Sequence, residues 1–330
     1  MSVSAVPSTL ANPGSSAAAA ELHIALHVGC ASARLILDME EIDREDRSMD
    51  LVGSLIFTAI VAANVSLVSR DPALQRAYSA LAEPAPESLL RPVSISAVAH
   101  SLRMPFETVR RRVRGMVRDG LIADAPGGVM VSEAVMAAGD FLKGMVKRHD
   151  RLAHFYREMK EIGALTPTDP DAPAPPPEAA PIRISNRAMW QYLLRTVDDL
   201  MNLTGDVLKS LLFLGIVRAN IADLPVSSLG AWRRSPLEHA QPVRTFPLAV
   251  GLDLSPESCR RYAIALEAAG LCRRTRAGLV ACVPPAQLPS VDRILATNLV
   301  NVQRLFATLR QLGALEAWDM APPRAILASA

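Results

Sequence analysis

The chain has 330 residues, which is long enough for two domains that each bury a core of their own. Half of the residues are hydrophobic but only 4% are aromatic, so we expect a mainly α-helical protein packed through small side chains. The formal net charge of +2 does not make the whole chain basic, so any binding of nucleic acid must depend on local clusters of charge.

The first domain is expected to follow a short tail. Residues 1–19 are small and polar with Pro and Gly, a composition typical of disorder, and the domain then covers residues 20–165. Within it the apolar run 51–68 approaches the length that can cross a membrane. Asn64 and several serines interrupt this run, so we expect a helix buried in protein, in a core or a dimer interface, and no membrane partner.

A compact pattern follows between residues 96 and 131. It predicts a helix over 96–102 and a second helix that opens at Pro105, where the missing N–H is harmless. Along the second helix Val109 and Val113 repeat at helical spacing and face the core. Gly120 is placed to end that helix, and a β-hairpin follows over 121–131.

Residues 166–183 are rich in proline and predict a semi-extended linker, which leaves 184–330 as the second domain. The same pattern returns there. Ser255 is suited to cap a helix that has Pro256 in its first position, and Gly270 ends it before a second hairpin.

The two predicted domains are copies of one another. Residues 91–165 align without a gap onto 241–315 at a shift of 150, and the helix after Asp50 aligns with the helix after Asp206 at a shift of 156. The matched pairs include Asn64 with Asn220, Glu107 with Glu257, Arg110 with Arg260, Gly120 with Gly270 and Gly128 with Gly278. Each copy is expected to hold a buried helix, a variable connection, a compact core and a final long helix ending in Gly-Ala-Leu.

The stretch PFETVRRRVRGMVRDGLI, which begins at Pro105, resembles the recognition helix of MarR-type and IclR-type transcriptional regulators of the winged helix-turn-helix superfamily. The resemblance covers about forty residues of each copy and implies a fold that is mainly α with short β-hairpin wings. In MarR-type proteins the flanking helices form the dimer interface, which implies two tandem winged-helix domains arranged as an intrachain pseudo-dimer. The helices over 51–68 and 207–221 would then meet inside the chain, and a further homodimer stays open.

The charge pattern points to double-stranded DNA as the partner. Seven arginines and two acidic residues lie between Arg91 and Gly120, whereas in the second copy the arginines move into the hairpin. One α-helix fits the major groove, and arginine can pair with guanine or phosphate. The candidate DNA-binding residues are Phe106, Glu107, Thr108, Arg110, Arg111, Arg114 and Arg118 in the first copy, and Glu257, Ser258, Arg260, Arg261, Arg273, Arg274 and Arg276 in the second. The competing interpretation is that these arginines only solvate an exposed helix face.

The sequence predicts no enzyme, cofactor or metal. It has no phosphate-binding glycine loop, nucleophile motif or HExxH, and His23 and His27 lack a third ligand nearby. The four cysteines lack CxxC spacing and no signal peptide precedes them, which indicates a reduced, cytoplasmic protein. Cys272 and Cys282 allow a thiol switch, but core positions suit them better. Aromatic residues could line an effector pocket or pack the core: Trp190, Tyr192, Phe213 and Trp232.

Together these observations favour a DNA-binding regulator of transcription that uses two recognition helices in successive major grooves. The alternatives are a tandem winged-helix module for protein interaction in chromosome organisation, and a replication initiator.

Overall fold

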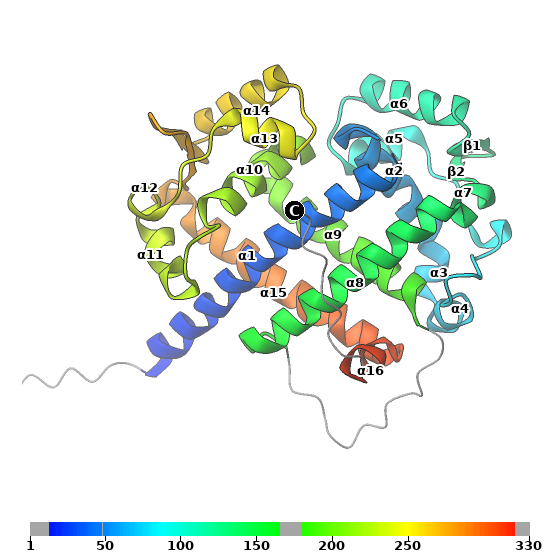
Figure 1. Ribbon diagram of the computed structural model, residues 1–330, viewed down its shortest axis with the longest axis horizontal. Helices are drawn as coiled ribbons and strands as arrows, with labels where there is room; N and C mark the ends of the chain where they lie inside the picture. Colours follow the sequence, from blue (N-terminus) through cyan, green and yellow to red (C-terminus); the bar gives the residue numbers. More distant parts are fainter. Residues whose placement is uncertain (1–12, 48, 166–179, 321–330) are drawn as a thin grey trace, which may run out of the picture.

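The computed structural model describes residues 13–47, 49–165 and 180–320, and this part of the chain is mainly helical with two small antiparallel sheets (Figure 1). The first half contains α1 (Pro13–Arg47), α2 (Leu51–Asn64), α3 (Ser66–Arg70), α4 (Pro72–Ala77), the 3₁₀ turn Glu87–Leu89, α5 (Ile95–Ser101), α6 (Phe106–Arg118), β1 (Ile122–Ala125), β2 (Gly128–Val131), α7 (Glu133–Ala137) and α8 (Gly139–Ile162).

The second half contains α9 (Ile182–Thr204), α10 (Val207–Asn220), the 3₁₀ turn Val226–Ser228, α11 (Leu229–Arg234), α12 (Pro236–His239), α13 (Thr245–Gly251), α14 (Pro256–Ala268), β3 (Cys272–Arg274), β4 (Leu279–Ala281), the 3₁₀ turn Pro285–Gln287, α15 (Leu288–Gln311) and α16 (Ala314–Met320).

The ends of the predicted segments shift in the structure. Helix α1 begins at Pro13, inside the segment 1–19 that was expected to be a disordered tail, whereas residues 1–12 lie outside the described residues. Helix α9 begins at Ile182, two positions before the expected start of the second domain, and residues 166–179 of the predicted linker are not described. Both long helices therefore reach into segments whose composition predicted no regular structure.

Four long helices form the centre of the molecule. Helix α1 packs against α8 of its own half and against α10 and α15 of the other half, while α9 packs against α15, α10 and α8. Figure 1 shows α1 crossing the middle of the molecule, with the other three helices around it. One continuous cluster of buried apolar side chains runs through both halves. The sequence predicted that the halves meet through α2, α10, α8 and α15. It did not predict that α1 and α9 take part, although these helices supply much of the contact between the halves.

The first long helix of each half, α1 or α9, also contacts the other half through polar side chains. From α9, Arg183 donates to the backbone oxygen of Leu81 at 2.8 Å and Arg187 to that of Tyr78 at 2.9 Å. From α1, Arg44 donates to the backbone oxygen of Gly251 at 2.8 Å. Arg183 and Arg187 are buried and their donors need partners, so these two contacts favour one relative placement of the halves.

Helix α2 is buried, but it is shorter than the apolar run that predicted it. It ends at Asn64, and the chain turns into α3 at Ser66. By length and composition the window Ala20–Glu45 of α1 could cross a membrane, as could the bent pair formed by α9 and α10. Most of the window in α1 is buried inside the protein.

The first of two similar units consists of α2, α5, α6, β1 and β2, and is called the first unit below. Helix α6 turns Val109, Val113 and Met116 inward, as their helical spacing predicted. Pro105 is the N-cap residue and the helix begins at Phe106, one position after the predicted start. Gly120 has φ +72°, and the N–H of Leu121 bonds to the oxygen of Met116 at 2.9 Å, which closes the helix end.

The second unit consists of α10, α13, α14, β3 and β4 in the same order along the chain. Ser255 caps α14 by accepting from the N–H of Ser258 at 3.1 Å, and Pro256 takes the first helical position as predicted. Cys259 and Ala263 fill the positions of Val109 and Val113 on the buried face. Gly270 has φ +74° and ends the helix.

A buried asparagine ties the hairpin of each unit to its first helix. Asn64 donates from Nδ2 to the backbone oxygens of Arg91 at 2.7 Å and Val129 at 3.2 Å, and its Oδ1 accepts from the N–H of Val131 at 2.8 Å. In the second unit Asn220 makes the same three bonds, to Gln241, Leu279 and Ala281. Both side chains are fully buried.

Each hairpin also pairs with the residue two positions before the first small helix of its unit. Val93 exchanges two backbone hydrogen bonds with Val129, and Val243 does the same with Leu279. Beside these pairs a Cβ atom on Gly128 would lie 2.2 Å from the oxygen of Val93, at φ +157°. Glycine is therefore required by the close approach of the two backbones, and Gly278 meets Val243 in the same way.

We expect Asn64→Ala to lower the free energy of unfolding by about 2–4 kcal/mol, because it leaves the N–H of Val131 and the oxygen of Arg91 without their partner and removes one of the two donors to the oxygen of Val129. Urea denaturation followed by circular dichroism measures this change. Asn202→Ala is the matched control, since Asn202 is exposed and should change stability by about 0.5 kcal/mol or less. Equal losses in the two variants would contradict a structural role for the buried asparagine.

Candidate nucleic-acid interface

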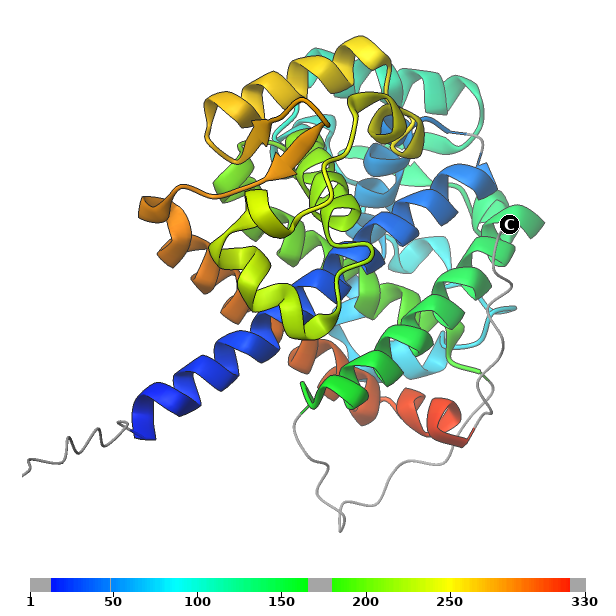
Figure 2. The same ribbon diagram turned by 60° about the vertical axis from the view of Figure 1, so that its left-hand side comes forward.

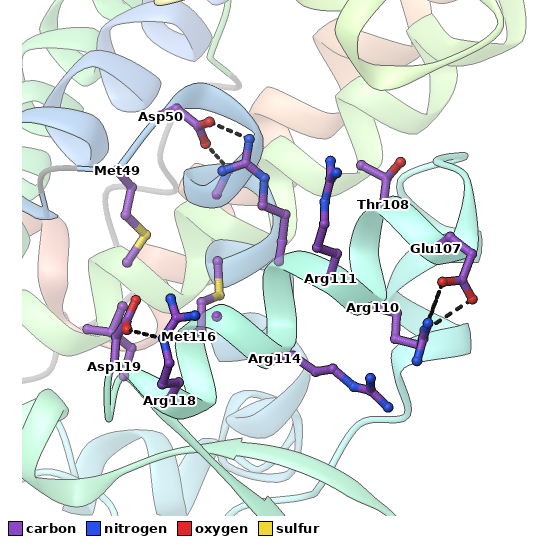
Figure 3. A pocket seen from close by; sticks show the side chains of 14 residues that line it. Met49, Asp50, Glu107, Thr108, Arg110, Arg111, Arg114, Met116, Arg118 and Asp119 are labelled. Atoms are coloured by element: carbon purple, nitrogen blue, oxygen red, sulfur yellow. Dashed lines mark hydrogen bonds and ion pairs between the residues drawn. The ribbon is translucent and has the colours of Figure 1, made fainter.

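A surface groove of about 1050 Å³ runs along α6, where it faces the junction of α1 and α2. Figure 3 shows it from close by. The junction contributes Met49, Asp50 and Gly53, and α6 contributes most of the remaining wall. Arginine is the main charged residue of the groove: Arg110, Arg111, Arg112, Arg114 and Arg118 line it.

Three carboxylates line the groove, and each holds one arginine. Glu107 binds Arg110 at 2.6 Å, and Asp119 binds Arg118 at 3.1 Å. Hydrogen bonding from Arg110 lowers the pKa of Glu107 below its usual range, so Glu107 is ionised at neutral pH. The groove therefore keeps a surplus of positive charge.

Two arginines supply that surplus. Arg111 and Arg114 are exposed and have no carboxylate partner among residues 13–47, 49–165 and 180–320. In Figure 3 both side chains extend from α6 without an interaction to a neighbour. Long cations that are not paired within the protein are free to bind phosphate or base edges. Phe106, 47% exposed, lies at the start of the same helix, and Thr108 is half-buried beside Arg111.

The third ion pair joins α6 to the core, and sequence reasoning missed it. Asp50 caps α2 by accepting from the N–H of Gly53 at 2.8 Å, and its second oxygen binds Arg112 at 2.5 Å. Arg112 is therefore a positioning residue between α2 and the groove. In the second unit Tyr262 takes its place and Asp206 binds Lys209, so the repeat offered no signal for this contact.

The candidate residues of the second unit divide in a similar way. Arg260 binds Glu257 at 3.2 Å, and Arg274 binds Glu267 at 2.8 Å. The guanidinium of Arg261 lies 5.1 Å from the ring centre of Tyr262. The remaining two candidate arginines, Arg273 and Arg276, are exposed and have no carboxylate partner in the described chain. Ser258 is half-buried and hydrogen-bonds within its own helix, to Ser255.

The two units present these helices on one side of the molecule. In Figures 1 and 2, α6 and α14 lie along the same rim, with the four long helices beneath them. The hairpins lie toward the outer flanks in Figure 1. One extended ligand could therefore contact both helices and both hairpins.

Of the two cysteines next to the second hairpin, Cys272 is buried and Cys282 is half-buried. Cys272 pairs in register with Ala281, and all four cysteines are free thiols. Burial raises the pKa of Cys272 and of Cys30 to about 12. The thiolate is the reactive form, so these groups are inert at neutral pH.

We expect iodoacetamide at pH 7.5 to leave Cys30 and Cys272 unmodified in the folded protein, because their pKa values lie far above the solution pH and the thiols stay protonated. Mass spectrometry of the alkylated peptides measures this, with urea-unfolded protein as the control in which all four thiols react. Rapid labelling of native Cys272 would support the thiol switch instead.

No cluster of three potential metal ligands occurs within the described ranges. His23 and His27 have ring centres 6.5 Å apart on α1. Comparison with known proteins finds no family whose model matches the chain, no matching curated protein and no matching solved structure.

Proposed function

We propose that the chain binds double-stranded DNA and regulates transcription, with its two units acting as tandem winged helix-turn-helix domains that arose by duplication. The unpaired Arg111 and Arg114 on the exposed face of α6 carry this proposal. Helix α6 is held from behind by a buried apolar face and by the Arg112–Asp50 pair. An exposed basic helix held in this way matches the width of the major groove and the charge of the phosphates beside it.

The shared arrangement of the units supports a pseudo-dimer within one chain. Both units use a buried asparagine, a glycine where the hairpin meets Val93 or Val243, and a left-handed glycine after the second small helix. The residues between the small helices, Arg103 and Asp253, both have φ near +50°. Because α6 and α14 share one rim, they suit two successive turns of a duplex.

We expect Arg111→Ala with Arg114→Ala to weaken binding to a random-sequence 30-base-pair duplex by about tenfold or more, and to reduce the slope of log K against log salt by about 2, since two phosphate contacts are lost. Fluorescence anisotropy across a salt series measures both quantities. Arg70→Ala with Arg304→Ala is the matched control, because it removes two exposed arginines outside the candidate interface. Equal effects of the two double variants would show that binding depends on net charge alone and not on the arginines of α6.

We also expect one chain to occupy one DNA site, with two protected major-groove segments about 34 Å apart, because both units belong to the same molecule. Footprinting on sites selected from a random pool measures the spacing, and sedimentation of the complex measures the stoichiometry. The half-sites should differ in sequence, since Arg114 is matched by Ile264 in the second unit. Two chains per site, each protecting one segment, would contradict the pseudo-dimer.

One observation favours the alternative of a protein-interaction module. Helix α13 exposes Phe246 (67%) and Val250 (63%), one turn apart, where α5 has the polar Ser96 and His100. Exposed apolar side chains of this size are typical of protein contacts. On this alternative Phe246→Ser would abolish capture of a protein partner from its native lysate, and the Arg111 and Arg114 variant would leave the function unchanged.

A further inference from the structure

A largely apolar cavity of about 140 Å³ lies between α1 and the second half, and the function proposed above does not use it. Its walls come from α1, α9, α10, α11, α15 and the chain that leaves β4. Phe213 and Trp232 line it, as an effector pocket would require, whereas Trp190 and Tyr192 are packed in the core. The cavity thus lies where α1, α9 and α15 meet the second unit.

The first half fills the corresponding space. At the shift of 150 that relates the halves, Asn298 of the cavity corresponds to Arg148 and Val291 corresponds to Phe141. Arg148 is 1% exposed, binds Asp43, donates to Asn186 at 2.8 Å and lies over the ring of Trp190. In the second half two smaller side chains, Asn298 and Val291, therefore stand where the first half has an arginine and a phenylalanine. The difference in side-chain size leaves space for the cavity.

The polar groups at one end of the cavity are already satisfied. Asn298 donates to the hydroxyl of Ser32 at 2.9 Å and accepts from the hydroxyl of Tyr192 at 3.0 Å. Burial raises the pKa of Tyr192 to about 12 and that of Cys30 also to about 12, so both stay neutral beside the cavity. This end offers a wall without charge.

The donors on α11 are not satisfied. Trp232 is 8% exposed, and its indole Nε1–H has no acceptor in the described chain. The Nε–H of Arg233, the next residue of the cavity wall, also has none, although its Nη2 binds Asp292. A buried N–H without an acceptor is unfavourable by about 1–3 kcal/mol, so two such groups beside one cavity indicate an absent acceptor.

We propose that this cavity binds a small apolar molecule, about the size of one aromatic ring, that carries a carbonyl or carboxylate acceptor for Trp232 and Arg233. Apolar walls with a few polar groups that fix orientation are typical of small-molecule sites. A cavity of this volume suits a single ring. The site does not depend on the proposed DNA binding, and a failure of either leaves the other intact.

The test measures acetophenone and benzoate, which carry an acceptor, against ethylbenzene, which does not, by calorimetric titration without DNA. Val291→Phe restores the residue of the first half and should weaken binding of all three probes at least tenfold. Val300→Phe is the matched control, because it makes the same change at an exposed position of the same helix (51%) and should change binding less than twofold. Thermal unfolding confirms that both variants fold.

The acceptor requirement is tested separately. Trp232→Phe keeps a ring in the wall but removes the Nε1–H, and should weaken acetophenone and benzoate about tenfold, the equivalent of one hydrogen bond. Ethylbenzene should change less than threefold. The proposal is overturned if wild type binds no probe at millimolar concentration, if Val291→Phe binds as wild type does, or if Trp232→Phe affects all three probes equally.

Discussion

The packing of α1 through the middle of the molecule is the contact on which the rest of the structure depends. It joins α8 of its own half to α10 and α15 of the other, so one continuous core holds both units. A two-domain protein with a small interface would let its domains move relative to one another. Here the central helices fix α6 and α14 on one rim, and the proposed binding of one DNA duplex by both units depends on this placement.

The two halves share the residues that the fold requires, and they differ in their exposed residues. The buried asparagines and the glycines beside Val93 and Val243 are the same in both, because the asparagines satisfy buried backbone groups and the glycines allow two backbones to approach closely. The exposed residues differ. The first unit keeps its unpaired arginines on α6, while the second keeps them on the hairpin and exposes Phe246 and Val250 on α13.

The interior of the four-helix centre varies as well. In the first half Arg148 and Asp43 form a fully buried ion pair, which is weak support for stability but demands a specific geometry. In the second half Asn298 stands at the matching position, and the space is left as the cavity beside Trp232. The same helical frame therefore carries a filled site in one half and an open site in the other.

The sequence by itself predicted the helical class, both small helices of each unit, their buried faces and the hairpins, because local periodicity and the positions of glycine and proline set these elements. It also predicted the repeat, and with it the pairing of Asn64 with Asn220. Only the tertiary structure decided that α1 begins within the expected tail and lies at the centre. It alone showed that Arg112 pairs with Asp50 and that Arg111 and Arg114 have no carboxylate partner in the described chain. Those outcomes depend on contacts between residues far apart in the chain or on side-chain conformation, to which spacing along a helix is blind.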